Sequence, residues 1–288
     1  MANGILIVDK PEGWTSQDVV AKLRGVYHEK RVGHGGTLDP MATGVLPVFF
    51  GRATRAVEFF EHAEKAYETT LRLGTVTNTQ DSTGTVLQEA PVTVTEEDIR
   101  AVLPRFLGKQ QQIPPMYSAI KIGGKKLYEL ARAGKEVERK PREIEIFRLE
   151  LRGFDGVCCD LYIHCSKGTY VRTLCHDIGA ALNCGGCMTA LRRVRAGAYT
   201  VDESHPLSEV VAHPDPQTLL LPTDSLFSDF PALTLNHAQE KKCRNGAEFR
   251  SECADGTYRV YGADHTFLAV CIAKNQTIQT VKSFFEPL

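Results

Sequence analysis

Segments with strand periodicity and segments with helical character follow one another irregularly along this chain of 288 residues. Between Tyr67 and Leu73, Tyr, Thr and Leu alternate with Glu, Thr and Arg, which is the period of a half-buried strand. Ile5 to Val8 is a short apolar run that ends at a Pro/Gly turn, and Tyr170 to Leu182 has helical character. Because no regular strand–helix repeat emerges, we expect an α+β fold with a mixed, largely antiparallel sheet flanked by helices.

Prolines mark a boundary late in the chain. Five of them lie between Pro206 and Pro231, together with several Ser and Asp residues, a composition typical of a connector. Beyond it, two strand-like segments, 258–261 and 267–271, flank a Gly-Ala-Asp-His turn and indicate a β-hairpin. We predict a large domain over residues 1–205, a connector over 206–231 and a small β-rich domain over 232–288.

Composition and the N-terminus indicate the class of protein. Hydrophobic residues make up 42% and charged residues 24%, which excludes a disordered chain or a fibre. The apolar run before Asp9 is too short for a signal peptide. No segment approaches the roughly 20 apolar residues that span a bilayer, so we expect a cytoplasmic protein without a membrane partner.

The nine cysteines raise the question of a metal site. Their odd number in a chain of this size favours small buried side chains over disulfides. Cys184-Gly-Gly-Cys187 has the spacing of a metal or redox pair, but no second CxxC or HxxxH pair completes the four ligands of a structural zinc site. We expect no metal and no other cofactor.

Charge is distributed unevenly along the chain. Residues 201–288 hold 7 Lys+Arg against 12 Asp+Glu, so the preceding 200 residues carry 27 against 23 of the total 34 and 35. Residues 121–142 contain eight basic and three acidic side chains. This local density is suited to a polyanion, although such a run also occurs on an ordinary solvated face.

Residues 31–47, which include the stretch from Gly33 to Gly44, are too rich in glycine and proline for a regular element and predict a shaped loop. It has neither the Walker lysine nor the strand-to-helix setting of a dinucleotide site, so a nucleotide-binding loop is disfavoured. Pro40 biases Asp39 toward extended backbone and removes one donor beside it. The loop therefore presents a carboxylate where a large group could approach, unless Asp39 only forms an Asx turn.

Four motifs of the chain resemble those of the TruB family of tRNA pseudouridine synthases, over essentially its whole length. They are Leu6 to Ser16, Gly33 to Leu46 around Asp39, Lys65-Ala66-Tyr67 leading into Leu73-Gly74, and Gly168 to Leu174 followed by Leu191-Arg192-Arg193. The string GHGGTLDPMATGVL is the most specific of them. The resemblance implies the pseudouridine synthase fold with a small C-terminal PUA-like RNA-binding domain.

The resemblance also implies an isomerase that converts uridine to pseudouridine. That reaction breaks an N-glycosidic bond, turns the base and rejoins it through carbon without net redox change, so it needs no cofactor. Asp39 matches the essential aspartate of the family, and its carboxylate can act at either the base or the sugar. An aspartate attacks only when ionised, and Arg172 matches the family's active-site arginine, which keeps it charged.

Further substrate-binding residues are carried over from the same motifs. Tyr67 matches the tyrosine that stacks against the flipped uracil, although it would otherwise be a cross-strand aromatic side chain. Tyr170 and Leu191 correspond to residues that hold the base, and His34 to the loop histidine that contacts the RNA. Lys10 is expected to support the loop around Asp39 without a catalytic role.

The expected partner is the T-stem loop of tRNA. In the family, the segment that corresponds to residues 112–146 is an insertion that grips this RNA, and its positive charge and aromatic residues are suited to it. Arg192, Arg193 and Arg195 form a second basic cluster. The acidic C-terminal domain is expected to add little affinity for phosphate.

Two other functions stay open from the sequence. One is an RNA-binding, tRNA-folding chaperone in which catalysis is secondary, and the other is the catalytic subunit of guide-RNA pseudouridylation particles. The joint presence of Asp39, Tyr67 and Arg172 argues against lost activity. The compact C-terminal end resembles the stand-alone bacterial type, for which we expect a monomer without an obligate protein partner.

Overall fold

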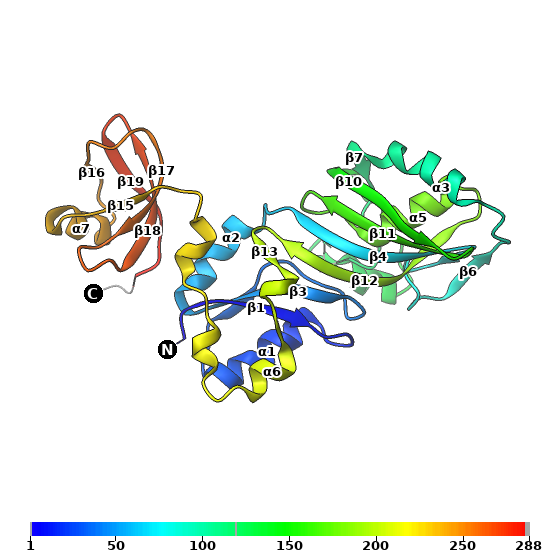
Figure 1. Cartoon of the computed structure of the whole chain (residues 1–288), viewed down its shortest axis with the longest axis horizontal. Helices are drawn as coiled ribbons and strands as arrows, with labels where there is room; N and C mark the ends of the chain where they lie inside the picture. Colours follow the sequence, from blue (N-terminus) through cyan, green and yellow to red (C-terminus); the bar gives the residue numbers. More distant parts are fainter. Residues whose placement is uncertain (1, 119, 286–288) are drawn as a thin grey trace.

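The computed structural model describes residues 2–118 and 120–285, which build one large and one small β-sheet (Figure 1). Ten strands of the described residues form the large sheet, in the order β14-β1-β3-β12-β4-β11-β10-β7, with β2 beside β3 and β13 beside β12. Their bounds are β1 (Gly4–Lys10), β2 (Val32–His34), β3 (Thr43–Phe50), β4 (Lys65–Leu73), β7 (Gly108–Gln112), β10 (Arg142–Phe154), β11 (Cys158–Cys165), β12 (Gly186–Ala196), β13 (Tyr199–Thr200) and β14 (His205–Pro206).

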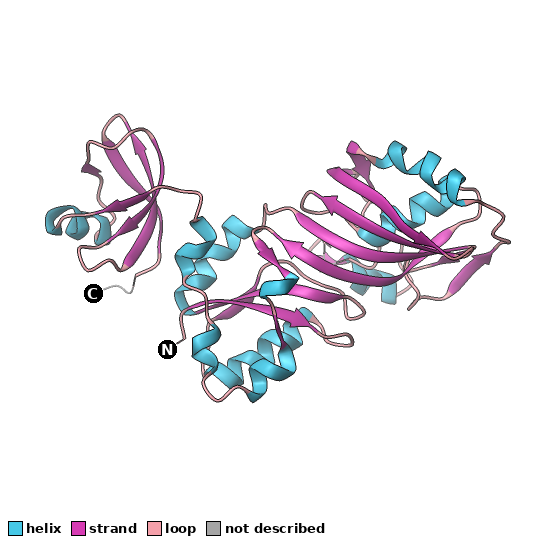
Figure 2. Ribbon diagram, viewed as in Figure 1, coloured by secondary structure: helices cyan, strands magenta, loops and turns pink. Residues whose placement is uncertain are grey.

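Helices flank this sheet, as Figure 2 shows. They are α1 (Ser16–Tyr27), α2 (Val57–Phe60), α3 (Glu96–Val102), α5 (Val171–Ala181) and α6 (Leu207–Ala212). Of the strand pairs in the large sheet, β1–β14 and β12–β3 are parallel and the others are antiparallel. The expected α+β class, with a mixed and largely antiparallel sheet, is confirmed.

The parallel contact between β3 and β12 joins the two halves of the large sheet. It consists of two register pairs, Arg192 with Thr43 and Arg193 with Gly44. The glycine-rich loop is shorter than the predicted range 31–47, because Val32–His34 form β2 and β3 begins at Thr43. It ends at this junction, and Leu38 and Ala42 of the loop belong to the first of three hydrophobic cores that pack on the large sheet.

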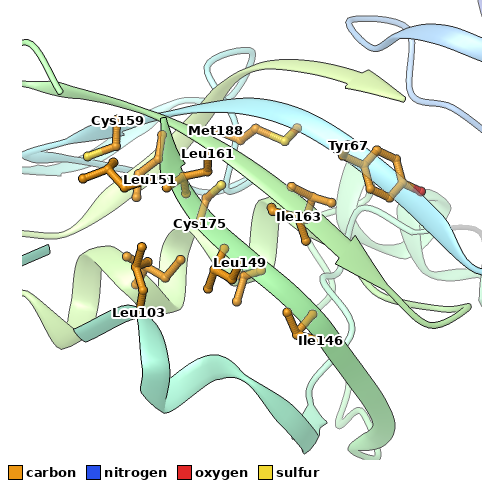
Figure 3. Packing of buried hydrophobic residues seen from close by; sticks show 14 of the residues in the cluster. Tyr67, Leu103, Ile146, Leu149, Leu151, Cys159, Leu161, Ile163, Cys175 and Met188 are labelled. Atoms are coloured by element: carbon orange, nitrogen blue, oxygen red, sulfur yellow. The ribbon is translucent and has the colours of Figure 1, made fainter. Parts of the chain in front are cut away.

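The first of these cores lies between α5, α3 and the strands β4, β10 and β11. Every second residue of β4 points into it, as the sequence period predicted: Leu71 and Leu73 are buried, while Glu68 and Arg72 are exposed. Tyr67 lies at the end of this core, and Figure 3 shows its hydroxyl directed away from the apolar cluster. A second core joins α1 and α6 to β1 and β3.

The insertion between β7 and β10 contains a small hairpin, β8 (Lys121–Ile122) with β9 (Lys125–Lys126), and the helix α4 (Leu127–Arg132). The end residues of the range 112–146 belong to the large sheet, because Gln112 pairs with Arg142 and Ile146 with Gly108. A second hairpin, β5 (Thr75–Thr77) with β6 (Val86–Glu89), follows β4. Both extensions reach the region of the glycine-rich loop through contacts described below.

The C-terminal sheet has the order β15-β17-β18-β19-β16 and carries the helix α7 (His237–Arg244). Its strands are β15 (Ala232–Thr234), β16 (Phe249–Arg250), β17 (Gly256–Tyr261), β18 (Phe267–Lys274) and β19 (Thr277–Ser283). Val270 and Phe284 share a core with Phe227 and with Phe60 of α2. An ion pair of 2.7 Å between Lys282 and Glu58 adds to this contact. The C-terminal sheet therefore packs against α2 beside the large sheet.

Candidate active site

The loop between β2 and β3 is held in place by close backbone contacts. Gly44 has a φ of +98°, and a Cβ there would lie 2.2 Å from the carbonyl oxygen of Arg193. Only glycine allows this backbone conformation and this approach without strain. At Asp39 the chain turns, since the amide of Ala42 donates to its carbonyl oxygen at 3.0 Å. The junction of the sheet thereby fixes where the carboxylate of Asp39 lies.

The carboxylate of Asp39 forms an ion pair with Arg172 in the first turn of α5. The distance from Oδ2 to Nη2 is 3.2 Å, and the side chain of Asp39 is 37% exposed while that of Arg172 is 8% exposed. A buried arginine thus faces a carboxylate that solvent or a ligand can reach. The sequence predicted that these two residues meet, and their 3.2 Å contact shows that they do.

A second carboxylate, which the sequence analysis did not identify, also faces Arg172. Oδ2 of Asp81 lies 3.4 Å from Nη1, and its side chain is 5% exposed. Its other oxygen accepts hydrogen bonds from the hydroxyls of Thr79 and Thr83 and from the amide of Thr83. These bonds compensate the burial of the negative charge and fix its position.

The insertion also contacts Arg172. The carbonyl oxygen of Tyr117 accepts a hydrogen bond of 2.7 Å from Nη2 of Arg172. Gln112 receives a hydrogen bond from the amide of Tyr170 and donates one to its carbonyl oxygen, at 2.8 and 3.1 Å. The ring of Tyr170 lies 5.9 Å from the guanidinium carbon of Arg172. Tyr170 and the base of the insertion therefore lie beside the ion pair.

Tyr67 and Arg193 form a buried pair next to the loop. Arg193 is 1% exposed, its guanidinium donates to the carbonyl oxygens of Val45 and Gly36, and its charge acts on the phenol of Tyr67. Burial raises the pKa of Tyr67, and the guanidinium opposes this rise. Arg193 was grouped with Arg192 and Arg195 as a second basic cluster, but in the structure its side chain points inward from β12 and is buried.

His34 and Lys10 also border the glycine-rich loop that carries Asp39. Burial, together with the charge of Arg193, lowers the pKa of His34, and its Nδ1 is buried without a hydrogen-bond partner in the described residues. Burial lowers the pKa of Lys10 to about 8. Its Nζ donates to the carbonyl oxygens of Pro11, Trp14 and Pro40. Lys10 therefore ties the Pro/Gly turn to the residue after Asp39.

Leu191 lies on β12 opposite Thr69 and packs, partly buried, against the first core. It also borders a hollow of about 770 Å³ on the sheet, which Met41, Thr43 and Arg192 line as well. Neither Asp39 nor Arg172 lines this hollow. Of the predicted residues, Asp39, Arg172 and Tyr170 thus lie in one cluster with Tyr67 and His34 bordering the same loop, and Leu191 lies on the neighbouring strand.

Within residues 2–118 and 120–285, no three His, Cys, Asp or Glu side chains are grouped so that they could hold a metal ion. Seven of the nine cysteines are buried, and none of the nine is in a disulfide. No helix in these ranges has the length and apolar character that a bilayer crossing requires. The side chains that meet beside the glycine-rich loop include a carboxylate, a guanidinium and a phenol.

Comparison with known proteins assigns the family. Residues 24–171 match the model for the N-terminal domain of TruB family pseudouridylate synthases, and residues 172–228 match the tRNA pseudouridylate synthase B C-terminal domain. The chain is 45% identical over 276 residues to tRNA pseudouridine synthase B of Pseudomonas fluorescens (strain Pf0-1), covering 93% of this chain and 90% of that protein. It is 44% identical over 265 residues to the protein of the same name from Aromatoleum aromaticum, covering 91% and 86%.

A solved Cbf5–Nop10–Gar1 complex contains a chain with the same fold, at a TM-score of 0.75 and 24% identity, covering 99% of this chain and 86% of that one. Because the two family regions follow one another without a gap and close relatives align over nine-tenths of its length, this chain belongs to the TruB family of pseudouridylate synthases.

Proposed function

We propose that this chain converts uridine to pseudouridine in the T loop of tRNA, at conventional position 55, with the carboxylate of Asp39 as nucleophile. The observation that carries the proposal is the contact of 3.2 Å between this carboxylate and the buried guanidinium of Arg172. Arg172 stabilises the negative charge that an attacking aspartate needs. Asp39 is at the same time exposed enough to meet a substrate.

The other residues of the site support the same reaction. A uridine reaches Asp39 only after it leaves its stack, at a cost of a few kcal/mol that contacts with the protein must offset. Tyr67 and Tyr170 supply aromatic rings for the base, Leu191 an apolar contact, and His34 a contact with the RNA beside it. The insertion, whose residues 121–142 are basic, provides phosphate contacts, and Tyr117 links it to Arg172.

The test compares Asp39→Asn with Asp229→Asn, an exposed aspartate in the connector. Both variants and the wild type are incubated with an unmodified tRNA transcript, without guide RNA or protein partners. We expect Asp39→Asn to bind the transcript with an affinity close to wild type and to form no pseudouridine, while Asp229→Asn is fully active. Turnover by Asp39→Asn would refute the nucleophile. No turnover by the wild type on naked tRNA would refute the stand-alone enzyme.

The same variants separate catalysis from a chaperone function. A chaperone has no need of the carboxylate, so tRNA refolding measured with Asp39→Asn tests that activity alone. Pseudouridine at a position other than 55 in the transcript would contradict the proposed target while leaving the reaction intact.

A further inference from the structure

The only tryptophan of the chain, Trp14, lies in the turn between β1 and α1 and is 36% exposed. A large aromatic side chain that is left at the surface, outside the four hydrophobic cores, is informative because burial of its ring would be strongly favourable. It borders a hollow of about 590 Å³, which we call the Trp14 hollow. Its other apolar walls are Pro11, Pro206, Leu207 and Val211.

The rim of the Trp14 hollow is positively charged. Lys22 of α1 and Arg192 of β12 line it together with one carboxylate, Asp9, while Lys10, which also borders the hollow, is fully buried. Arg192 is held by Asp9 at 2.7 Å, whereas Lys22 has no ion-pair partner among the described residues. The side chains therefore offer an apolar floor and a cationic edge to a ligand that has an apolar face and a negative charge.

The Trp14 hollow adjoins the glycine-rich loop that carries Asp39. The amide of Gly13 donates to the carbonyl oxygen of Pro40 at 2.8 Å, and Lys10 donates to Pro40 and to the carbonyl oxygen of Trp14. Thr43, which ends the loop, lines the hollow. The turn that carries Trp14 thus contacts Pro40, the residue after Asp39, so the neighbouring unit of a polymer bound at Asp39 can reach the hollow.

From these contacts we propose that the Trp14 hollow binds an unpaired nucleotide that flanks the target uridine, with its base on the Trp14 ring and its phosphate near Lys22 and Arg192. The inference rests on the proposed function, because it takes RNA as the substrate. An aromatic platform beside cations is how proteins hold single-stranded nucleic acid. The volume of the Trp14 hollow, about 590 Å³, lies within the range of about 300–1,000 Å³ that is typical of small-molecule sites.

Because Trp14 is the sole tryptophan, its fluorescence reports on the hollow without any substitution there. Asp39→Asn is titrated with an end-labelled T-arm hairpin, and Trp14 fluorescence and RNA anisotropy are recorded together. We expect quenching with the same midpoint as the anisotropy change. An abasic residue at one of the two positions flanking the target should abolish the quenching while the hairpin still binds. Binding without quenching overturns the inference and leaves the proposed function standing, whereas no binding overturns both.

Variants give an independent measurement. Loss of one stacked base should raise the Kd of Trp14→Ala for the hairpin about tenfold. Trp14→Phe should retain most of the affinity, as should the control Val281→Ala, an exposed apolar side chain of the C-terminal sheet. Lys22→Gln should reduce the salt dependence of binding by about one phosphate contact. Equal Kd values for Trp14→Ala and the wild type would contradict a stacked nucleotide.

Discussion

Asp81 lies 3.4 Å from Nη1 of Arg172, so the guanidinium that faces Asp39 through Nη2 is held from behind by a second, buried carboxylate. One buried arginine thus serves two carboxylates with different exposure, 5% for Asp81 and 37% for Asp39. Asp81 carries three hydrogen bonds from Thr79 and Thr83 and has little access to a substrate. Its position indicates that it orients Arg172, while Asp39 is free to react.

We expect Asp81→Asn to lower kcat about 100-fold, because a misplacement of about 1 Å in a catalytic group is sufficient for such a loss. The Kd for tRNA should change little, since Asp81 is buried away from the RNA. Asp160→Asn, which removes an exposed carboxylate bonded to Thr70, is the control. Single-turnover kinetics and binding measured on the same protein check this expectation. A variant with normal kcat would show that Asp39 and the carbonyl oxygen of Tyr117 position Arg172 without Asp81.

Arg193 supports the site from inside the sheet. Its guanidinium donates to the carbonyl oxygens of Gly36 and Val45 from two different nitrogens, a geometry that the single ammonium of lysine cannot reproduce. We expect Arg193→Lys to fold and to lose about 10- to 100-fold in kcat with little change in Kd. Arg195→Lys, two residues along the same strand and 41% exposed, should be close to wild type. Equal losses of kcat in the two variants would mean that the activity depends on every arginine of β12 alike, and not on the buried contacts of Arg193.

The sequence contained enough to predict the class of fold and the pair Asp39 and Arg172. The class of fold follows from local patterns, whereas the pair was implied by the resemblance of the motifs Gly33 to Leu46 and Gly168 to Leu174 to those of the TruB family. The predicted helix Tyr170 to Leu182 is α5 (Val171–Ala181), and the strand Tyr67 to Leu73 lies within β4 (Lys65–Leu73). Local pattern was sufficient for these elements because propensity, periodicity and burial all agree there.

Asp81 and Arg193 could not be identified in the same way. Asp81 lies in a polar turn that resembles any surface loop, and only its contact with Arg172, 91 residues later, buries it. Arg193 was grouped with Arg192 and Arg195 by composition, because the strand β12 was not predicted. Once β12 is known, alternation of its side chains separates the buried Arg193 from Arg192, and the register shift between Arg193 and Arg195 separates it from Arg195. The missing information was a strand assignment and one contact distant in sequence.

Gly33 and Gly44, at the two ends of the glycine-rich loop, should differ sharply in their tolerance of alanine. Gly44 has a φ of +98°, and its added Cβ would meet the backbone of Arg193 at 2.2 Å, so Gly44→Ala should destabilise the fold by about 3 kcal/mol or more. Gly33 has no atom within 4 Å of an added Cβ, so Gly33→Ala is the matched control. Urea denaturation of both variants measures the difference. Similar free energies of unfolding for the two variants would mean that β3 can shift away from β12 to accommodate the added methyl group.

The cluster of buried cations around the loop should appear in the pH dependence of stability. Burial, and then the charge of Arg193, lowers the pKa of Lys65 from 10.5 to about 8. From about pH 8 to 10.5 the unfolded chain therefore holds a proton that the folded chain has released, so this group makes the protein more stable as pH rises. The contribution is unfavourable to folding below pH 8, where both states are protonated.

Lys65→Met removes this titration from a side chain that is 8% exposed. We expect the free energy of unfolding of the wild type, minus that of the variant, to increase between pH 8 and 10.5, when both are measured by urea denaturation. Taking the difference cancels the other groups that titrate in this range, among them the buried cysteines and Tyr67. Lys125→Met, at an exposed position of the insertion, controls for the loss of a lysine as such. If this difference in the free energy of unfolding stays constant between pH 8 and 10.5, Lys65 keeps its proton in the folded protein. Water would then reach the base of the glycine-rich loop.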